Sequence, residues 1–310
     1  MNRVILGSRG SKLALWQSNW VSDRLREAHP GLEVEIRIIK TTGDRFQQPS
    51  IPELGGKGAF TKEIQDALLA SDIDLAVHSL KDLPTWPVPG LRVLAYPERV
   101  DPRDAWVSRD GTPFAKLAEG DRVATGSLRR QAQLRNRFGG VRVESIRGNV
   151  DTRLRKLRES DMTGMVLAMA GLTRLGLLEH VTEPVDPKWM LPSPGQGALA
   201  VEGRDEAAYA KLLEPLEHAP TRRAVEAERA LLAGLEGSCQ VPIGGLAREE
   251  GETLILDGLL ASPDGSKLVR KTERGPLDQT AAIGTRLAAR IRGDGGGEIL
   301  RILQDPGEAR

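Results

Sequence analysis

Residues 73–84, IDLAVHSLKDLP, decide the fold class that the sequence predicts. The first five form a short apolar run, which is typical of a strand buried on both faces of a parallel sheet. Charged residues follow at the carboxyl end of this run, where open α/β sheets bind their ligands. There Lys81 offers a contact to an anion and Asp82 is a candidate general acid or base, although charged loops also form plain surface ion pairs. The stretch therefore predicts an α/β sheet with a ligand site at this edge.

The same order of strand, small-residue turn and helix recurs along the chain. Short apolar runs precede such turns at 4–6, 122–125, 141–146 and 165–168. A helix that begins at a strand end aims backbone N–H groups at an anion, and an arginine fork binds carboxylates in a bidentate way. We expect a polyanion-binding cleft, although a solvated surface is the alternative for each arginine. The arginines at these strand ends are Arg129, Arg130, Arg147, Arg153 and Arg174, and Arg9 lies in the first turn.

The length of the chain predicts more than one domain. Single hydrophobic cores stop growing at roughly 250–300 residues, and this chain has 310. Prolines between 87 and 102 and a Pro/Gly-rich stretch at 191–197 mark two crossings between α/β lobes, which resembles the periplasmic binding protein architecture. A smaller α+β domain follows, with strands near 242–248, 253–261 and 267–273. The predicted domains are 1–98 with 196–216, 99–195, and 217–310.

Composition and charge narrow the function classes. The formal net charge is +1, which gives no global electrostatic case for nucleic acid or a membrane surface. Apolar content of 39% and charged content of 28% are ordinary for a globular protein. The first residues show no apolar signal-peptide core, and no run approaches the ~18 apolar residues of a membrane span. We expect a cytoplasmic protein.

The only cysteine of the chain, Cys239, lies in the stretch 237–245, GSCQVPIGG. A helical pattern ends just before this stretch and an extended run begins after it, which predicts a thiol on a loop between two elements. A lone cysteine cannot form an internal disulfide, and most are small buried hydrophobes. Here the flanking residues are polar or glycine, which favours a covalent attachment point or a nucleophile.

Three hypotheses remain at this point. The first is an enzyme that acts on a substrate with several carboxylates and holds something covalently on the thiol. The second is a non-catalytic anion-binding module, such as the sensor domain of a regulator, which has no need of Asp82 or of the thiol. The third, a nucleic-acid binder, is weak because the charge is balanced and the lobes lack interleaved stacking aromatics.

Eight motifs then identify a resemblance. The sequence closely resembles the porphobilinogen deaminase (hydroxymethylbilane synthase) family, with motifs in the family's order from residue 9 to about 245. The matching stretches are RGSKLALWQ at 9–17, GGKG at 55–58, HSLKDLP at 78–84, SLRRQ at 127–131, RGNVDTR at 147–153, AGLTRLG at 170–176, PGQGAL at 194–199 and GSCQVPIG at 237–244.

The resemblance implies a fold of two lobes like those of a type II periplasmic binding protein, plus an α+β C-terminal domain with a three-stranded antiparallel sheet. It implies a transferase that condenses four porphobilinogen molecules head to tail, with loss of ammonia, and releases hydroxymethylbilane for a downstream synthase. It also implies a dipyrromethane cofactor joined to Cys239 by a thioether, a cytoplasmic monomer, and no metal, nucleic acid or membrane partner.

Site residues are carried over where this sequence matches the family's motifs. Asp82 matches the catalytic aspartate, which would assist loss of the amine and stabilise cationic azafulvene and pyrrolenine intermediates. Besides Cys239 and Asp82, the cofactor-binding positions are Arg9, Ser11, Lys81, Thr125, Ser127, Arg129, Arg130, Arg147, Gly148, Arg153 and Arg174. The substrate-binding positions are Arg9, Gln17, Lys57, Arg147, Arg153 and Arg174, with Lys57 in a loop over the cleft.

Overall fold

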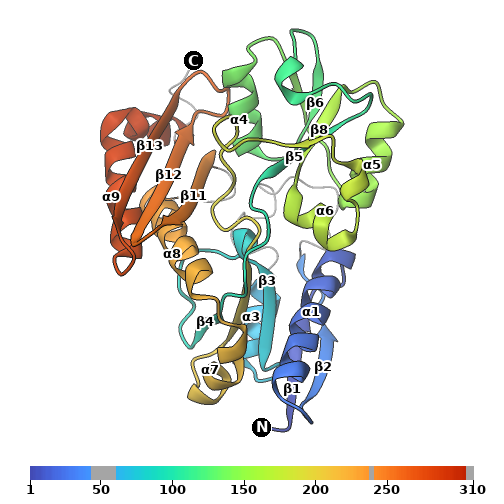
Figure 1. Ribbon diagram of the computed structural model, residues 1–310, viewed down its shortest axis with the longest axis vertical. Coiled ribbons are helices and arrows are strands. Elements are labelled where there is room, and N and C mark those ends of the chain that lie inside the picture. Colours follow the sequence, from blue (N-terminus) through green and yellow to red (C-terminus); the bar gives the residue numbers. More distant parts are fainter. Residues whose placement is uncertain (43–60, 237–240, 305–310) are drawn as a thin grey trace. The chain divides into compact units, whose positions relative to one another are not determined.

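The computed structural model describes residues 1–42, 61–236 and 241–304 (Figure 1). The chain forms two compact units, one of residues 1–100 and 197–222, the other of residues 101–196 and 223–310. Lys57 and Cys239 lie outside the described residues. The three domain boundaries given above stay a prediction.

The first unit is built on a five-stranded sheet in the order β2-β1-β3-β10-β4. Its strands are β1 (Arg3–Ser8), β2 (Glu33–Ile38), β3 (Leu75–Ser79), β4 (Leu91–Ala95) and β10 (Leu199–Arg204). β1 pairs in parallel with β2 and β3, whereas β10 runs antiparallel between β3 and β4. The apolar run that opened the sequence analysis therefore supplies the central strand, which confirms the α/β class.

Helices cover both faces of this sheet. Val21 and Leu25 of α1 (Lys12–Ala28) pack with Leu212 of α7 (Ala207–Leu213) against one face. Ile64 and Leu68 of α3 (Lys62–Leu69) pack against the other. Burial on both faces explains why residues 75–77 of β3 are all apolar. Two short helices follow β3 and α7, namely η2 (Leu80–Asp82) and η5 (Glu214–Leu216).

The second unit contains a sheet with the same topology, in the order β7-β6-β8-β5-β9. Its strands are β5 (Asp104–Ser108), β6 (Arg122–Ala124), β7 (Arg142–Glu144), β8 (Gly164–Ala168) and β9 (Glu183–Pro184). β6 pairs in parallel with β7 and β8, and β5 is the antiparallel strand. The helices of this lobe are α4 (Leu128–Arg137), α5 (Val150–Arg158) and α6 (Met169–Leu175), with short helices η3 (Phe114–Lys116) and η4 (Leu178–His180).

The same unit ends in the predicted antiparallel sheet, drawn in orange to red in Figure 1. Its strands are β11 (Ile243–Glu250), β12 (Thr253–Ala261) and β13 (Leu268–Pro276), which pair as a meander. Leu231 of α8 (Ala219–Gly234) and Leu287 of α9 (Thr280–Ile291) pack against it in one core. The chain continues through η6 (Arg292–Gly296) into α10 (Gly297–Gln304). The fold class is thus two periplasmic-binding-protein-like α/β lobes and a small α+β domain.

Candidate functional site

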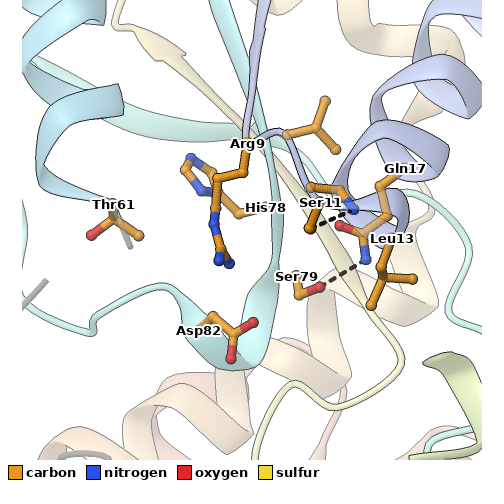
Figure 2. A pocket seen from close by; sticks show the side chains of 10 residues that line it. Arg9, Ser11, Leu13, Gln17, Thr61, His78, Ser79 and Asp82 are labelled. Carbon is orange, nitrogen blue, oxygen red and sulfur yellow. Dashed lines mark hydrogen bonds between the residues drawn. The ribbon is translucent and has the colours of Figure 1, made fainter. Parts of the chain in front are cut away.

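A pocket of the first unit brings together residues from the ends of β1 and β3 (Figure 2). Arg9 follows β1 directly, and Asp82 lies in η2, which follows β3. The first turn of α1 forms another side of the pocket. There the Ser11 hydroxyl caps the helix by accepting a hydrogen bond from the Ala14 N–H at 3.3 Å. The lining consists of Arg9, Ser11, Leu13, Ala14, Gln17, Thr61, Val77, His78, Ser79 and Asp82.

The predicted catalytic and binding residues of this unit meet in that pocket. Figure 2 shows the Arg9 side chain extending into it from the β1 end and the Asp82 carboxylate on the opposite side. The buried Gln17 donates from Nε2 to the Ser79 hydroxyl at 2.8 Å, which fixes the α1 wall against the end of β3. Lys81 precedes Asp82 in η2 and is half-buried. The pocket thus offers a cation for a ligand carboxylate and a carboxylate for a ligand N–H or cation.

The sequence analysis missed a buried ionisable pair in the wall of this pocket. His78 Nε2 of β3 lies 3.1 Å from Glu202 Oε2 of β10, and both side chains are almost fully buried. Gln65 of α3 donates to the other oxygen of Glu202 at 3.0 Å. The sequence signal was an ionisable residue directly after three apolar ones in each strand, LAVHS in β3 and LAVEGR in β10. The pair joins β3 to β10, and Gln65 joins α3 to the same carboxylate.

In the second unit, the turn between β6 and α4 carries two of the predicted donors, Thr125 and Ser127. Thr125 is buried, and its hydroxyl accepts a hydrogen bond from the Ser127 N–H at 3.2 Å. The Ser127 side chain caps α4 by accepting from the Arg130 N–H at 3.5 Å. Backbone and hydroxyl donors therefore gather at a helix N-terminus that begins at a strand end, as the sequence predicts.

Arg129 and Arg130 are not solvated; both lie against Asp104, the first residue of β5. Arg129 Nη1 donates to Asp104 Oδ2 and Arg130 Nη2 to Oδ1, each at 2.8 Å. Burial alone would raise the pKa of Asp104, but the two guanidinium groups hold it well below its usual range. Arg129 Nη1 also donates to the Leu191 carbonyl, and Arg130 Nη1 donates to the Val166 carbonyl. The buried group of three therefore carries one net positive charge.

Of the three other predicted arginines, Arg147 and Arg153 lie near the N-terminus of α5, and Arg174 lies in the last turn of α6. Gly148 has φ +118°, a conformation that L side chains rarely adopt, and its carbonyl accepts a hydrogen bond from Arg153 Nε at 2.8 Å. Arg147 is exposed beside it. Arg174 is buried on α6, and burial lowers its pKa to about 10. Burial also lowers the pKa of Arg153. Cations held in a low dielectric attract a carboxylate more strongly than solvated ones do.

The remaining predicted site residues are Lys57 and Cys239, which the structure does not describe. What it does describe are the elements on either side of the cysteine, α8 and β11. Among the described residues, no cluster of His, Cys, Asp or Glu has the makings of a metal site. A search of the same residues found no helix both long and apolar enough to cross a membrane.

Comparison with known proteins places the chain in a family. The model described as "Porphobilinogen deaminase, dipyromethane cofactor binding domain" matches residues 4–211, and "Porphobilinogen deaminase, C-terminal domain" matches residues 222–293. The chain belongs to the porphobilinogen deaminase family. The porphobilinogen deaminase of Desulforudis audaxviator is 48% identical over 96% of both chains. That of Methylobacillus flagellatus is 45% identical over 97% of both.

Solved structures with a similar fold are more distant. The effector-binding domain of BenM with benzoate has a TM-score of 0.42 at 15% identity, covering 69% of this chain and 90% of that one. A TRAP periplasmic solute binding protein from Desulfovibrio salexigens has a TM-score of 0.42 at 11% identity, covering 69% of this chain and 72% of its own.

Proposed function

We propose that the protein condenses four porphobilinogen molecules head to tail and releases hydroxymethylbilane. The observation that carries the proposal is the pocket at the ends of β1 and β3, which joins Arg9 to Asp82 in a porphobilinogen deaminase chain. Each addition breaks the bond between the aminomethyl carbon and nitrogen, and ammonia leaves. The same carbon of the incoming porphobilinogen bonds to the free ring carbon of the last pyrrole on the growing chain, and that ring carbon loses its proton. Water finally cleaves the completed tetrapyrrole from its attachment.

The cationic residues suit this substrate because every porphobilinogen carries an acetate and a propionate group. A growing chain therefore accumulates carboxylates, and each needs a donor or a cation. Arg9 supplies a cation in the Asp82 pocket, and the turns after β6 and β7 supply hydroxyl, backbone and guanidinium donors. The buried Arg174 adds a cation whose attraction to carboxylate is little screened by water.

Asp82 is the catalytic residue of the proposal. Its carboxylate is exposed at the mouth of the pocket, where it can accept a hydrogen bond from a pyrrole N–H. As an anion it stabilises the positive charge that develops on the pyrrole ring when the amine leaves. It can then hold the proton that the attacking ring carbon releases. Gln17 and Ser79 keep the wall beside it in place.

The donor set of the second unit fits the dipyrromethane cofactor that the family model names. Among the described residues, Arg129 Nε is buried and has no hydrogen-bond partner, so a donor remains for a carboxylate. Bound through a thioether to Cys239, the cofactor would supply a pyrrole end that primes the condensation. The residues that would hold its carboxylates and N–H groups are Arg9, Ser11, Lys81, Asp82, Thr125, Ser127, Arg129, Arg130, Arg147, Gly148, Arg153 and Arg174. Lys57 and Gln17 would contact substrate.

Asp82→Asn tests the assignment. The amide keeps the shape of the carboxylate but removes its charge and its ability to hold a proton, so ammonia release should fall by about 100-fold or more. Asp72→Asn, at an exposed position on the amino side of β3, is the matched control and should keep the wild-type rate. Ammonia and tetrapyrrole are measured together, with four ammonia expected per tetrapyrrole. A near-normal rate in Asp82→Asn would remove Asp82 from its role.

We further propose that the protein acts as a cytoplasmic monomer and hands its product to a downstream synthase. The family resemblance supports these statements. Sedimentation equilibrium of the purified protein should give the mass of one chain, 33.7 kDa. A stable dimer would contradict the monomer.

A further inference from the structure

Glu228 of α8 is a fully buried carboxylate that has no part in the proposed chemistry. Its Oε2 accepts a hydrogen bond from the Gly195 N–H at 2.6 Å, and its Oε1 accepts one from the Ala247 N–H of β11 at 2.8 Å. Burying a carboxylate costs several kcal/mol unless hydrogen bonds compensate. Here two backbone N–H groups from separate segments compensate for the burial. Through Glu228, their hydrogen bonds join the crossing segment, residues 191–197, to both α8 and β11.

The next residue of the crossing segment, Gln196, is hydrogen-bonded to a different part of the unit, at the start of β5. Gln196 Nε2 donates to Asp104 Oδ1 and to the Pro102 carbonyl, each at 2.8 Å. Asp104 in turn holds Arg129 and Arg130. Two successive residues thus bind in different directions, one toward the C-terminal sheet and one toward the arginine pair.

The packing of β11 on the same crossing is equally close. The Gly245 N–H donates to the Pro192 carbonyl at 2.9 Å, and a Cβ at Gly245 would lie 3.1 Å from Pro194 Cγ. A Cβ at Gly244 would lie 3.0 Å from Leu191 Cβ. The start of β11 therefore has little room to move against the crossing.

We propose that Asp104, Gln196 and Glu228 are positioning residues of a polar brace that sets the arginine pair relative to α8 and β11. Cys239 lies in sequence between α8 and β11, so the brace sets the two elements that flank the attachment point relative to the carboxylate-binding guanidinium groups. This inference rests on the proposed function, in which Cys239 carries the cofactor. An error of about 1 Å in the placement of a reacting group can slow a reaction roughly 100-fold.

The test is the rate at which the apo-protein gains its cofactor. Apo-protein made without a source of porphobilinogen is mixed with porphobilinogen, and the intact mass is followed over time under denaturing conditions. Glu228→Gln replaces one acceptor of the brace by a donor, and Gln196→Leu removes its link to Asp104. Each should attach pyrrole roughly 10- to 100-fold more slowly per folded molecule, with the folded fraction measured by circular dichroism.

Asp257→Asn is the matched control, because the hydrogen bonds that the structure describes for this carboxylate of β12 come from Arg248 and Thr272, both in the C-terminal sheet. It should attach pyrrole at the wild-type rate. Glu228→Gln and Gln196→Leu proteins that are folded and attach at the wild-type rate would overturn the brace. Failure of both to fold would also overturn it, in favour of a purely structural role. A wild type that attaches nothing would instead overturn the proposed function.

Discussion

Replacing Asp104 by asparagine should cost the protein far more stability than a typical loss of one hydrogen bond. The Asp104 side chain is completely buried, and those of Arg129 and Arg130 are 5% and 7% exposed. Asparagine can still accept from Arg130 and Gln196 through its one oxygen. Its amide N–H₂ would then face Arg129 Nη1, so two donors would meet and two buried cations would lack their anion.

The magnitude follows from that geometry. Removing one partner of a buried ion pair costs roughly 3–5 kcal/mol, because an uncompensated charge is left in a low dielectric. For a unit of this size each kcal/mol lowers the melting temperature by about 2–4 °C, so the expected loss is roughly 6–20 °C. The control, Asp121→Asn, removes a half-buried carboxylate that accepts from Thr163 and Ala118 at the amino end of β6. Its cost should be about 1 kcal/mol.

Thermal and urea unfolding of both variants, followed by far-UV circular dichroism at neutral pH, measures the difference. We expect Asp104→Asn to unfold at a clearly lower temperature and a lower urea concentration than Asp121→Asn. Equal midpoints for the two variants would refute it, since the arginine pair would then be solvated or held by other groups.

Two pH dependences follow from other buried groups. Burial and the hydrogen bond to Asp74 raise the pKa of Tyr209 to about 12, above its usual 10.0. The stability that this phenol adds is present below pH 10 and is lost as pH rises through 12, so the deficit of Tyr209→Phe in free energy of unfolding should shrink over that range. Arg174 has a pKa lowered to about 10 by burial, so its charge is lost as pH rises through 10. The KM for porphobilinogen should rise there in the wild type and rise less in Arg174→Gln, which already lacks the cation; identical profiles would contradict its role in binding carboxylate.

The sequence predicted the elements whose local pattern matches their environment. Buried parallel strands such as β3 are continuous apolar runs, and the turns after them carry the small and polar residues that start helices. The edge strands β4 and β9 were not predicted. β9 has only two residues, too few for a period to show, and β4 lies among the prolines that suggested a crossing.

The sequence could not predict which residues the arginines bind. Arg129 and Arg130 were expected to line a cleft, yet their guanidinium groups meet Asp104, a residue of the antiparallel strand β5. Only the sheet order brings β5 beside β8 and near α4, and no spacing in the sequence encodes that order. The same holds for His78 and Glu202, whose strands are far apart in the chain and adjacent in the sheet. The local sequence pattern predicts which side chains lie at a strand end. Which strands pair, and which of their side chains then meet, is known only from the fold.

The central claim is that the chain carries a pyrrole primer on Cys239. The most direct measurement is the intact mass of the purified protein after incubation with porphobilinogen, with a peptide map to locate any adduct. The account predicts an excess of two pyrrole units on the peptide that contains Cys239. A mass that stays unmodified, or an adduct on another peptide, would contradict it.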